Sequence, residues 1–445
     1  MNTALRAFQT GLDVTGHNIT NVNTAGYSRQ VMGLTDTSPT NYGNFMLGNG
    51  VSIAGVTRIQ DAFLAARQLA NNSEGSRAGT MLGGLQSIEG LTQEPGGAGI
   101  GTALDALYNA FSALGSNPNQ SSLLSGVQQA GSTLAARIRG LYSDLGQQKA
   151  NAASQITDSL NQVQSLANQI ADLNSQIRQQ QANGASPNDL LDMRDQKLQD
   201  LSSLTNIHVQ LQPDGSANVY MDQKTLVDQT GARQVPTAFD FATATVSDAN
   251  GTYQVAGGQT AGLMGLMRQV TSYQGQLDTL ANTIRTQFNS VHATGTNALG
   301  NTGVNFFNDA IPQTGAINFD LDPAIAADPK AIAAGVSGAA GDGGLALSLS
   351  ALRDSKVPSL GNTTMGGFYS SFIGGVASDS AAAKTETDTR TAISKQIDAQ
   401  IQSVSGVNLD EEMSNLLQFQ RSYQAAARAL SVFDQTTEDL INIIR

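Results

Sequence analysis

The sequence predicts a mainly helical protein of the α+β class: a long antiparallel helical bundle formed by the N- and C-terminal segments, with a small β-rich outer domain inserted into it. Three observations predict this class. Apolar residues recur at alternating steps of three and four near both ends of the chain, and they keep helical spacing over two long central stretches. Between those stretches, residues 206–258 change to the alternation that is typical of strands.

The two ends of the chain carry matching apolar stripes. The N-terminal stripe consists of Leu5, Phe8, Leu12, Thr15, Ile19 and Val22. The C-terminal stripe consists of Leu409, Met413, Leu416, Gln420, Tyr423, Ala427, Leu430, Asp434, Thr437, Ile441 and Ile444. This rhythm is typical of helices that pair side by side, so we expect the two ends to meet. Such stripes can also form a core within one chain, but a terminal helix of this length favours contacts between subunits.

The beginning of the C-terminal helix is well marked. Asn408 can cap it, and Glu411 lies three residues further on, as in a capping box. Asp410, Glu411 and Glu412 place negative charge at the positive end of the helix. No proline precedes Pro39 or follows Pro358, so both terminal helices can run without interruption.

The interior of the chain divides into helices and short connecting segments. We expect extended structure over residues 31–57, helices over 58–93, 104–114, 121–182, 190–204, 263–291 and 368–403, and irregular structure over 295–358. The turn sequence at 213–215 predicts a hairpin within the β-rich segment. Because that segment returns the chain to near its exit point, the helix over 263–291 should pack antiparallel to the helix over 121–182.

These elements predict three domains. Residues 1–30 and 405–445 form a terminal helical domain, residues 31–205 and 259–404 form a central long-helix bundle with short strands, and residues 206–258 form the β-rich outer domain.

Composition excludes several classes of function. The chain has 36 acidic and 24 basic residues and a net charge of −12, which does not favour binding to nucleic acid or to an anionic membrane. It contains no cysteine, so neither a disulfide nor a thiolate metal site can form. The first residues do not resemble a cleaved secretory signal, and no stretch reaches the length of a membrane span, so we expect no membrane insertion.

No arrangement of residues predicts catalysis or a cofactor. His17, His208 and His292 lie far apart, without carboxylates at ligand spacing. The run from Asp410 to Glu412 could be interpreted as a metal or acid–base cluster, but helix-start electrostatics explains it more simply. We therefore expect no catalytic, cofactor or metal site.

Three segments carry a resemblance to a known family. They are residues 18–30 (NITNVNTAGYSRQ), residues 189–196 (DLLDMRDQ) and residues 407–425, which begin VNLDEE and contain LLQFQ and YQA. Together they resemble the flagellar rod, hook and hook-associated proteins, and are most similar to the members that form the first hook–filament junction. The family motif falls on Asn18, Asn21, Asn23, Gly26 and Tyr27.

The resemblance implies a function as well as a fold. It implies an exported structural protein, an adaptor ring that joins the hook to the filament of the bacterial flagellum and assembles by head-to-tail packing of terminal helices. The implied partners are further copies of the chain, the hook protein, the second junction protein, an export chaperone that covers the C-terminal stripe, and the type III export apparatus. The implied contact residues are Leu5, Phe8, Leu12, Ile19, Val22, Leu409, Met413, Leu416, Tyr423, Leu430, Ile441 and Ile444.

Three alternatives remain open at this point. The chain could be another axial flagellar subunit of the hook or distal rod, although residues 189–196 and the long helix before them argue against this. It could be an exported enzyme acting on glycan, which should show a cleft with two converging carboxylates. Residues 206–258 could also carry a surface-adhesion function, which the sequence neither supports nor excludes.

Overall fold

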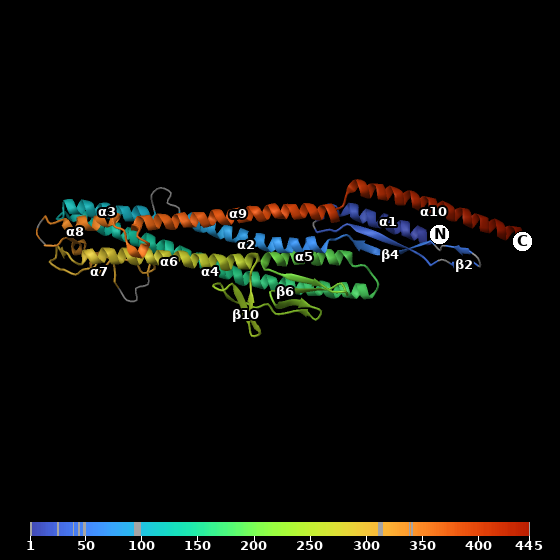
Figure 1. Ribbon diagram of the computed structural model, residues 1–445, viewed down its shortest axis with the longest axis horizontal. Helices are drawn as coiled ribbons and strands as arrows, with labels where there is room; N and C mark the ends of the chain where they lie inside the picture. The colour runs from blue at the N-terminus through green and yellow to red at the C-terminus, as the bar shows by residue number, and fades with distance from the viewer. Residues whose placement is uncertain are drawn as a thin grey trace.

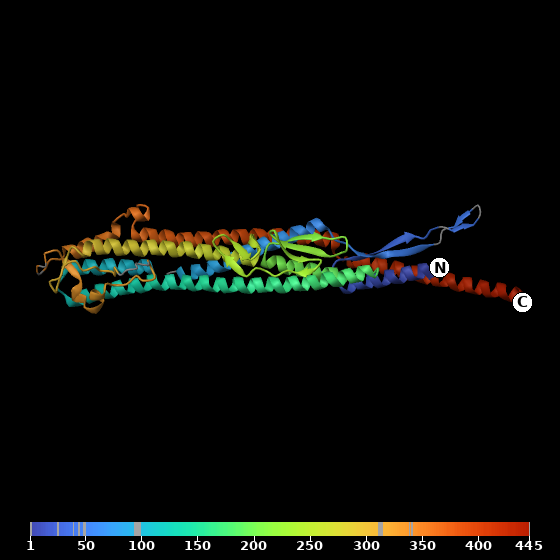
Figure 2. The same ribbon diagram turned by 90° about the horizontal axis from the view of Figure 1, so that it is seen from below.

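The molecule is a long rod of helices with a small β-rich lobe on one side and both termini at one end (Figure 1). The computed structural model describes residues 2–24, 26–38, 40–42, 45–47, 50–92, 99–309, 315–337, 339 and 341–444. The helices run along the rod, and small antiparallel sheets attach to them (Figure 2). The predicted fold class, mainly helical with a small β-rich insertion, is therefore confirmed.

The ends of the chain meet, as predicted. α1 (Asn2–Thr20) lies beside the first half of α10 (Leu409–Ile444), and α10 continues well past the end of α1 (Figure 1). After α1 the chain forms an antiparallel hairpin that projects beyond the bundle (Figure 2). Its strands are β1 (Gln30–Asp36) and β4 (Val51–Arg58), with β2 (Thr40–Tyr42) and β3 (Phe45–Leu47) at the tip.

Long helices form the bundle behind this hairpin. They are α2 (Ala62–Thr92), α3 (Ile100–Ser116), α4 (Ser121–Ala182), α5 (Asn188–Leu204), α6 (Gly258–His292) and α9 (Met365–Ser405). α4 and α6 are antiparallel, as predicted, because Ser159 bonds Thr260 while Lys149, earlier in α4, bonds Thr271, later in α6. The predicted start of the second helix at 58 is wrong by four residues, because the Asp61 carboxylate caps α2 through the N–H groups of Phe63 and Leu64.

The inserted segment folds into two small sheets. One has the order β5 (His208–Leu211), β6 (Ala217–Met221), β7 (Lys224–Asp228), β8 (Gly231–Ala232); the other pairs β9 (Ala238–Asp240) and β11 (Gly251–Gln254) with β10 (Thr245–Asp248). The predicted hairpin turn at 213–215 is confirmed: the Gln212 N–H donates to the Ser216 carbonyl, and Gly215 adopts φ +75°.

The far end of the rod is more ordered than predicted. Residues 295–358 contain β12 (Thr296–Asn297), α7 (Pro323–Ala327), β13 (Ala333–Gly335) and α8 (Gly344–Ala351), elements too short to show a hydrophobic period. They pack around buried aromatic rings of Phe111, Phe288, Phe306, Phe307 and Phe319. The expectation of irregular structure here is therefore wrong in part. Among the described residues, no helix is both long and apolar enough to cross a membrane.

Candidate assembly site at the base of the terminal helices

Three segments that are distant in sequence meet where the terminal helices join the bundle. They are the turn after α1, the first half of α5, and the connection from α9 into α10. These are the three segments that carry the family resemblance in the sequence. We call this junction, centred on Asn18, Arg29, Arg58, Asp192 and Glu412, the assembly site.

Asn18 organises the turn after α1. Its side chain is buried, and its amide nitrogen donates to the carbonyl of Gln30 at 2.9 Å and to Glu412 at 3.2 Å. Its amide oxygen accepts the N–H of Gln30 at 2.9 Å and the hydroxyl of Tyr27 at 2.7 Å. Since both amide protons and both lone pairs are used, no other side chain of this size can replace it without leaving a buried polar group unpaired.

Arg29 binds the start of α10. Its Nε donates to Glu412 at 2.7 Å, and its two terminal nitrogens bond Glu411 at 2.8 and 3.2 Å. The side chain of Glu412 is 2% exposed, so the charge of Arg29 and the hydrogen bond from Asn18 compensate a carboxylate that has little access to water. Burial tends to lower the pKa of Arg29, but the two carboxylates outweigh it and raise that pKa.

Asn408 caps α10 as predicted, accepting the N–H groups of Asp410 and Glu411. The predicted capping box is otherwise wrong, because the Glu411 carboxylate turns to Arg29 instead of to the backbone of Asn408. The acidic run at the start of α10 therefore serves a specific ion pair as well as the helix dipole. The described residues contain no group of three metal-ligating side chains.

A second ion pair connects the hairpin to α5. Arg58 contacts Asp192 at 2.8 Å and Asp195 at 2.7 Å, and the N–H of Ser28 donates to Asp192. Burial raises the pKa of Asp192, while the bonds from Arg58 and Ser28 oppose that rise. Burial and the neighbouring carboxylates likewise raise the pKa of Tyr27, so its hydroxyl stays protonated and donates to Asn18.

The backbone joins the three connections to one another. The N–H of Arg29 donates to the carbonyl of Ser405 at 3.0 Å, and the N–H of Ile59 donates to the carbonyl of Arg29 at 2.8 Å. The chain crosses between the terminal helices and the bundle at these three places. Arg29 therefore contacts the other two crossings, at Ile59 and Ser405, through its main chain, and it contacts the start of α10 through its side chain.

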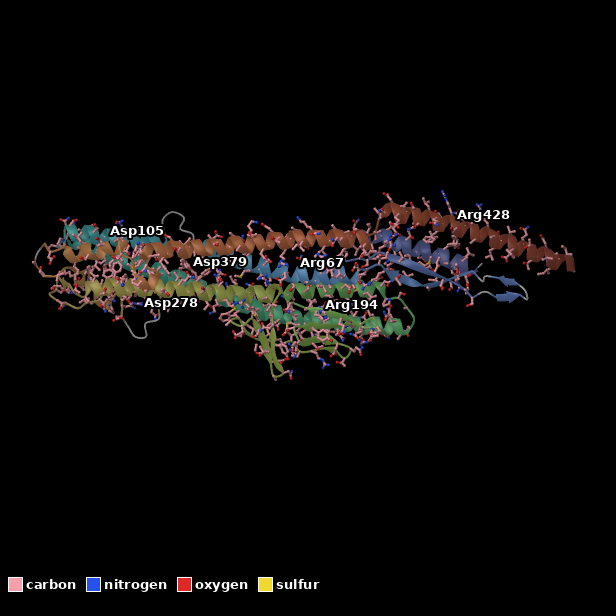
Figure 3. The ribbon with its side chains drawn as sticks, in the orientation of Figure 1. Arg67, Asp105, Arg194, Asp278, Asp379 and Arg428 are labelled. Atoms are coloured by element: carbon pink, nitrogen blue, oxygen red, sulfur yellow. The ribbon has the colours of Figure 1, made fainter. Side chains whose placement is uncertain are left out.

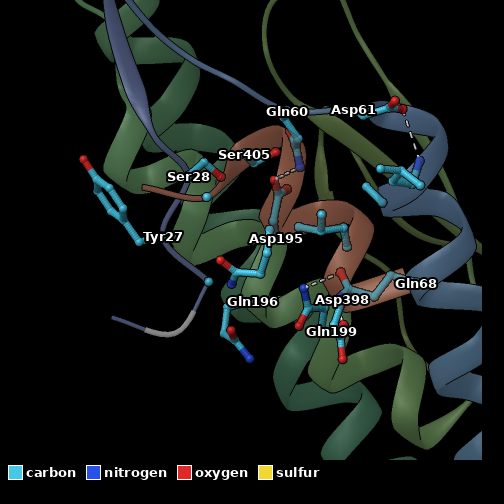
Figure 4. A pocket seen from close by; sticks show the side chains of 16 residues that line it. Tyr27, Ser28, Gln60, Asp61, Gln68, Asp195, Gln196, Gln199, Asp398 and Ser405 are labelled. Carbon is cyan, nitrogen blue, oxygen red and sulfur yellow. Dashed lines mark hydrogen bonds between the residues drawn. The ribbon is translucent and has the colours of Figure 1, made fainter. Parts of the chain in front are cut away.

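A cavity of about 200 Å³ lies between the turn that follows α1 and the helices α2, α5 and α9 (Figure 4). Its carboxylates already have partners: Gln60 donates to Asp195, Gln68 donates to Asp398, and backbone N–H groups donate to Asp61. A pair of free converging carboxylates, which the enzyme alternative requires, is therefore not found among the described groups that line it.

The family-motif residues have different surroundings. Asn21 donates to the His17 carbonyl and accepts from Thr24, which holds the turn. Gly26 adopts φ +78°, and a side chain there would meet Gln196 of α5. Asn23 is exposed, and Ala25 lies outside the described residues.

The predicted N-terminal contact residues lie on α1, the helix that packs beside α10, or directly after it. Leu5, Phe8, Leu12 and Ile19 are half-buried on α1, while Val22 falls in the turn after the helix. The closest approach is at Gly11, where an added Cβ would lie 2.9 Å from the Phe419 ring. Phe419 was not among the predicted contact residues, because it lies one position away from the predicted stripe.

The predicted stripe on α10 is divided between two environments. Leu416 and Leu430 are half-buried, and Glu412 and Phe419 share their side of the helix. Leu409, Met413, Tyr423 and Ile441 are exposed; the side chain of Ile444 lies outside the described residues. Every described side chain from Ser431 to Ile443 is exposed, and Arg428 projects into solvent (Figure 3). Packing within one chain therefore accounts for only part of the apolar stripe on α10.

Sequence reasoning missed the two arginines that hold the site together. A signal was available, since residues 1–60 contain only Arg6, Arg29 and Arg58 as basic residues. Only Asp13 and Asp36 are acidic in this segment, so an arginine that becomes buried there needs a carboxylate from a distant part of the chain. Which carboxylates those are depends on the tertiary fold.

Comparison with known proteins gives two family matches. Residues 85–307 match the flagellar hook-associated protein FlgK helical domain, and residues 399–443 match the C-terminal domain of flagellar basal body rod FlgEFG proteins. The chain is 28% identical to flagellar hook-associated protein 1 of Bacillus subtilis (strain 168), over 99% of this chain and 96% of that protein. It is 26% identical to the Salmonella typhimurium protein of the same name, over 99% and 98%.

A solved structure has the same fold. The flagellar hook junction protein FlgK from Burkholderia pseudomallei superposes with a TM-score of 0.64 at 18% identity, covering 76% of this chain and 100% of that one.

Proposed function

The chain belongs to the flagellar hook-associated protein FlgK family, and from that membership we propose that it is an exported structural component of the bacterial flagellum that joins the hook to the filament. The two family matches and the relatives, which align over nearly the whole chain, support this assignment. The proposal includes no catalytic step.

The observation that carries the proposal is the exposed half of the α10 stripe. Ile441 of the stripe and its neighbour Leu440 are each more than half exposed, in the part of α10 that continues past the end of α1 (Figure 1). The contact between α1 and α10 within one chain leaves apolar side chains uncovered, and every copy of the chain carries the same uncovered side chains. This arrangement suits a head-to-tail ring in which α10 of one subunit packs against its neighbour. We propose that Leu5, Phe8, Leu12, Ile19, Val22 and the exposed α10 residues form these contacts.

Specific partners are part of the same proposal. On the hook side the ring contacts the hook protein, and on the filament side the second junction protein. Before assembly, a small export chaperone covers the apolar face of α10 and the chain leaves through the type III export apparatus. The exposed apolar side chains at the end of α10 support this, since an uncovered patch of that kind promotes aggregation.

Deletion of the gene tests the function. Electron microscopy of the deletion strain should show hooks without filaments, and flagellin should appear in the culture medium. A copy of the gene on a plasmid should restore the filaments. Normal filaments in the deletion strain would overturn the proposal.

A further inference from the structure

A groove lies next to the assembly site, along the edge of the larger inserted sheet. It has a volume of about 550 Å³ and lies between α2, α5 and β5. Its helical wall includes four alanines of α2, which are Ala62, Ala65, Ala66 and Ala70, together with larger side chains such as Leu198 of α5. It shares Gln60, Gln68 and Asp195 with the cavity of the assembly site, so the two surfaces are continuous.

β5 presents an unpaired strand edge to this groove. In the described part of the chain it is the outermost strand of its sheet and pairs only with β6. In an antiparallel pair, every second residue of a strand directs its N–H and C=O groups toward the partner strand. Since Gln212 is hydrogen-bonded to Ser216, the N–H and C=O groups of Val209 and Leu211 point away from β6. Leu211 is 56% exposed. A free edge beside an apolar wall is the geometry that accepts an added strand.

The β1–β4 hairpin lacks the further strand that the free edge of β5 could provide. It is a two-stranded sheet on its own, and such a sheet is only marginally stable without a further strand or a packing partner. One face rests on α1, but Val31 and Leu34 are exposed on β1. The hairpin points past the end of the bundle, away from the β5 sheet of its own chain (Figure 2). A hairpin that fills the groove must therefore come from another copy.

Charge does not oppose this contact. Asp36 is the one charged residue between Val31 and Thr57 in the sequence. In the groove, Arg194 already pairs with Asp195 and also donates to the carbonyl of Gly215. For a chain with a net charge of −12, two surfaces whose charges are limited to Asp36 and the paired groups of the groove are a favourable place for copies to meet.

We propose that the β1–β4 hairpin of one copy docks in the α2–α5–β5 groove of a neighbouring copy and extends its sheet along β5. This inference rests on the proposed function, because it requires assembled subunits. It adds a second contact, made by strands and lateral to the contact between terminal helices.

Cysteine cross-linking in isolated flagella tests the proposal, since the chain has no cysteine of its own. Thr35→Cys on β1 or Ala54→Cys on β4 is combined with Gln210→Cys on β5; all three positions are exposed. A short bismaleimide should then give a ladder of covalent multimers. The matched control pairs the same hairpin cysteine with Ser348→Cys, at an exposed position of α8 at the far end of the rod, and should give monomer.

A second substitution reports the groove itself. Adding Leu211→Lys should lower the multimer yield by about tenfold, because the ammonium would enter an apolar groove. Leu299→Lys, at a similarly exposed leucine of the far end, should leave the yield unchanged. Monomer alone from both hairpin positions, or equal ladders with Ser348→Cys, would overturn the inference. The presence of the unsubstituted protein in isolated flagella is measured separately. Its absence there would contradict the proposed function rather than the docking of the hairpin.

Discussion

Arg29 and Glu412 lie 383 residues apart in the sequence and meet at 2.7 Å, with the carboxylate almost completely buried. The pair joins the turn after α1 to the first turn of α10. Together with the hydrogen bond from Asn18 to Glu412, it links the two ends of the chain directly through side chains at the point where both enter the bundle.

Arg29→Ala should destabilise the terminal helices by about 3 kcal/mol, because it leaves the Glu412 charge buried with Asn18 as its remaining partner. Amide hydrogen exchange of α1 and α10 measures the effect. Lys384→Ala, which removes an exposed ion pair with Asp388, is the control and should change little. Equal exchange in the two variants would show that the Arg29 pair is not important for stability.

Gly11→Ala should loosen the pairing of α1 with α10, since the new Cβ would lie 2.9 Å from the Phe419 ring. Gly16→Ala on the same helix meets nothing within 4 Å and should stabilise α1 by roughly 0.5–1 kcal/mol through helix propensity. Exchange protection of residues 2–20 distinguishes them, and Phe419→Leu should partly rescue Gly11→Ala. Similar protection in both glycine variants would contradict this packing.

Ile441→Asp should leave the stability of the isolated chain within about 0.5 kcal/mol of the original, because the side chain is exposed. It should nevertheless reduce the number of cells with filaments, since we propose that Ile441 contacts a neighbouring subunit. Asn442→Asp adds the same charge one residue away and is the control. Full motility with Ile441→Asp would exclude this part of α10 from the interface.

Stability should fall below about pH 6.5 because of His292. Burial lowers its pKa below the ordinary value of 6.5; Nδ1 donates to the Val304 carbonyl, and Nε2 accepts the N–H of Ala333. The unfolded chain therefore takes up the proton first as the pH falls, and stability is lost from that point downward. Well above pH 6.5 the imidazole is neutral in both the folded and the unfolded state, and His292 contributes no pH dependence.

Urea unfolding between pH 7.5 and 5 checks this prediction, with pH values chosen around the ordinary histidine pKa. His292→Gln should flatten the curve relative to the original chain. His208→Gln, at an exposed histidine of β5, should not. The raised pKa of Asp192 acts in the opposite direction, so the comparison between variants, and not the slope of one curve, is the test.

The long helices α4 and α6 were predictable because each has a continuous apolar stripe. The bounds of α4 follow from Ser121 to Ala182 as expected, and α1 and α10 meet as their stripes indicate. The short elements after His292 were not predictable, because two- to eight-residue segments cannot display a period. The division into three domains stays a prediction.

The assembly site was predictable as a set of segments and not as a set of contacts. The turn residues and Asn408 could be identified because caps and turns use local rules. The partners of Arg29 and Arg58 could not, since an ion pair across the fold leaves no local signal. The same limit explains why Phe419 was missed: a stripe gives the period of a helix, but not which neighbouring row faces the partner.

The three crossings at Arg29, Ile59 and Ser405 have a mechanical consequence. A rod joined to its terminal pair by one strand could swivel about that strand. Three connections that are hydrogen-bonded side by side resist rotation about the long axis, because twisting would stretch them unequally. In a part of a rotating shaft, such a joint would pass torque from the terminal helices to the outer bundle with little loss of angle.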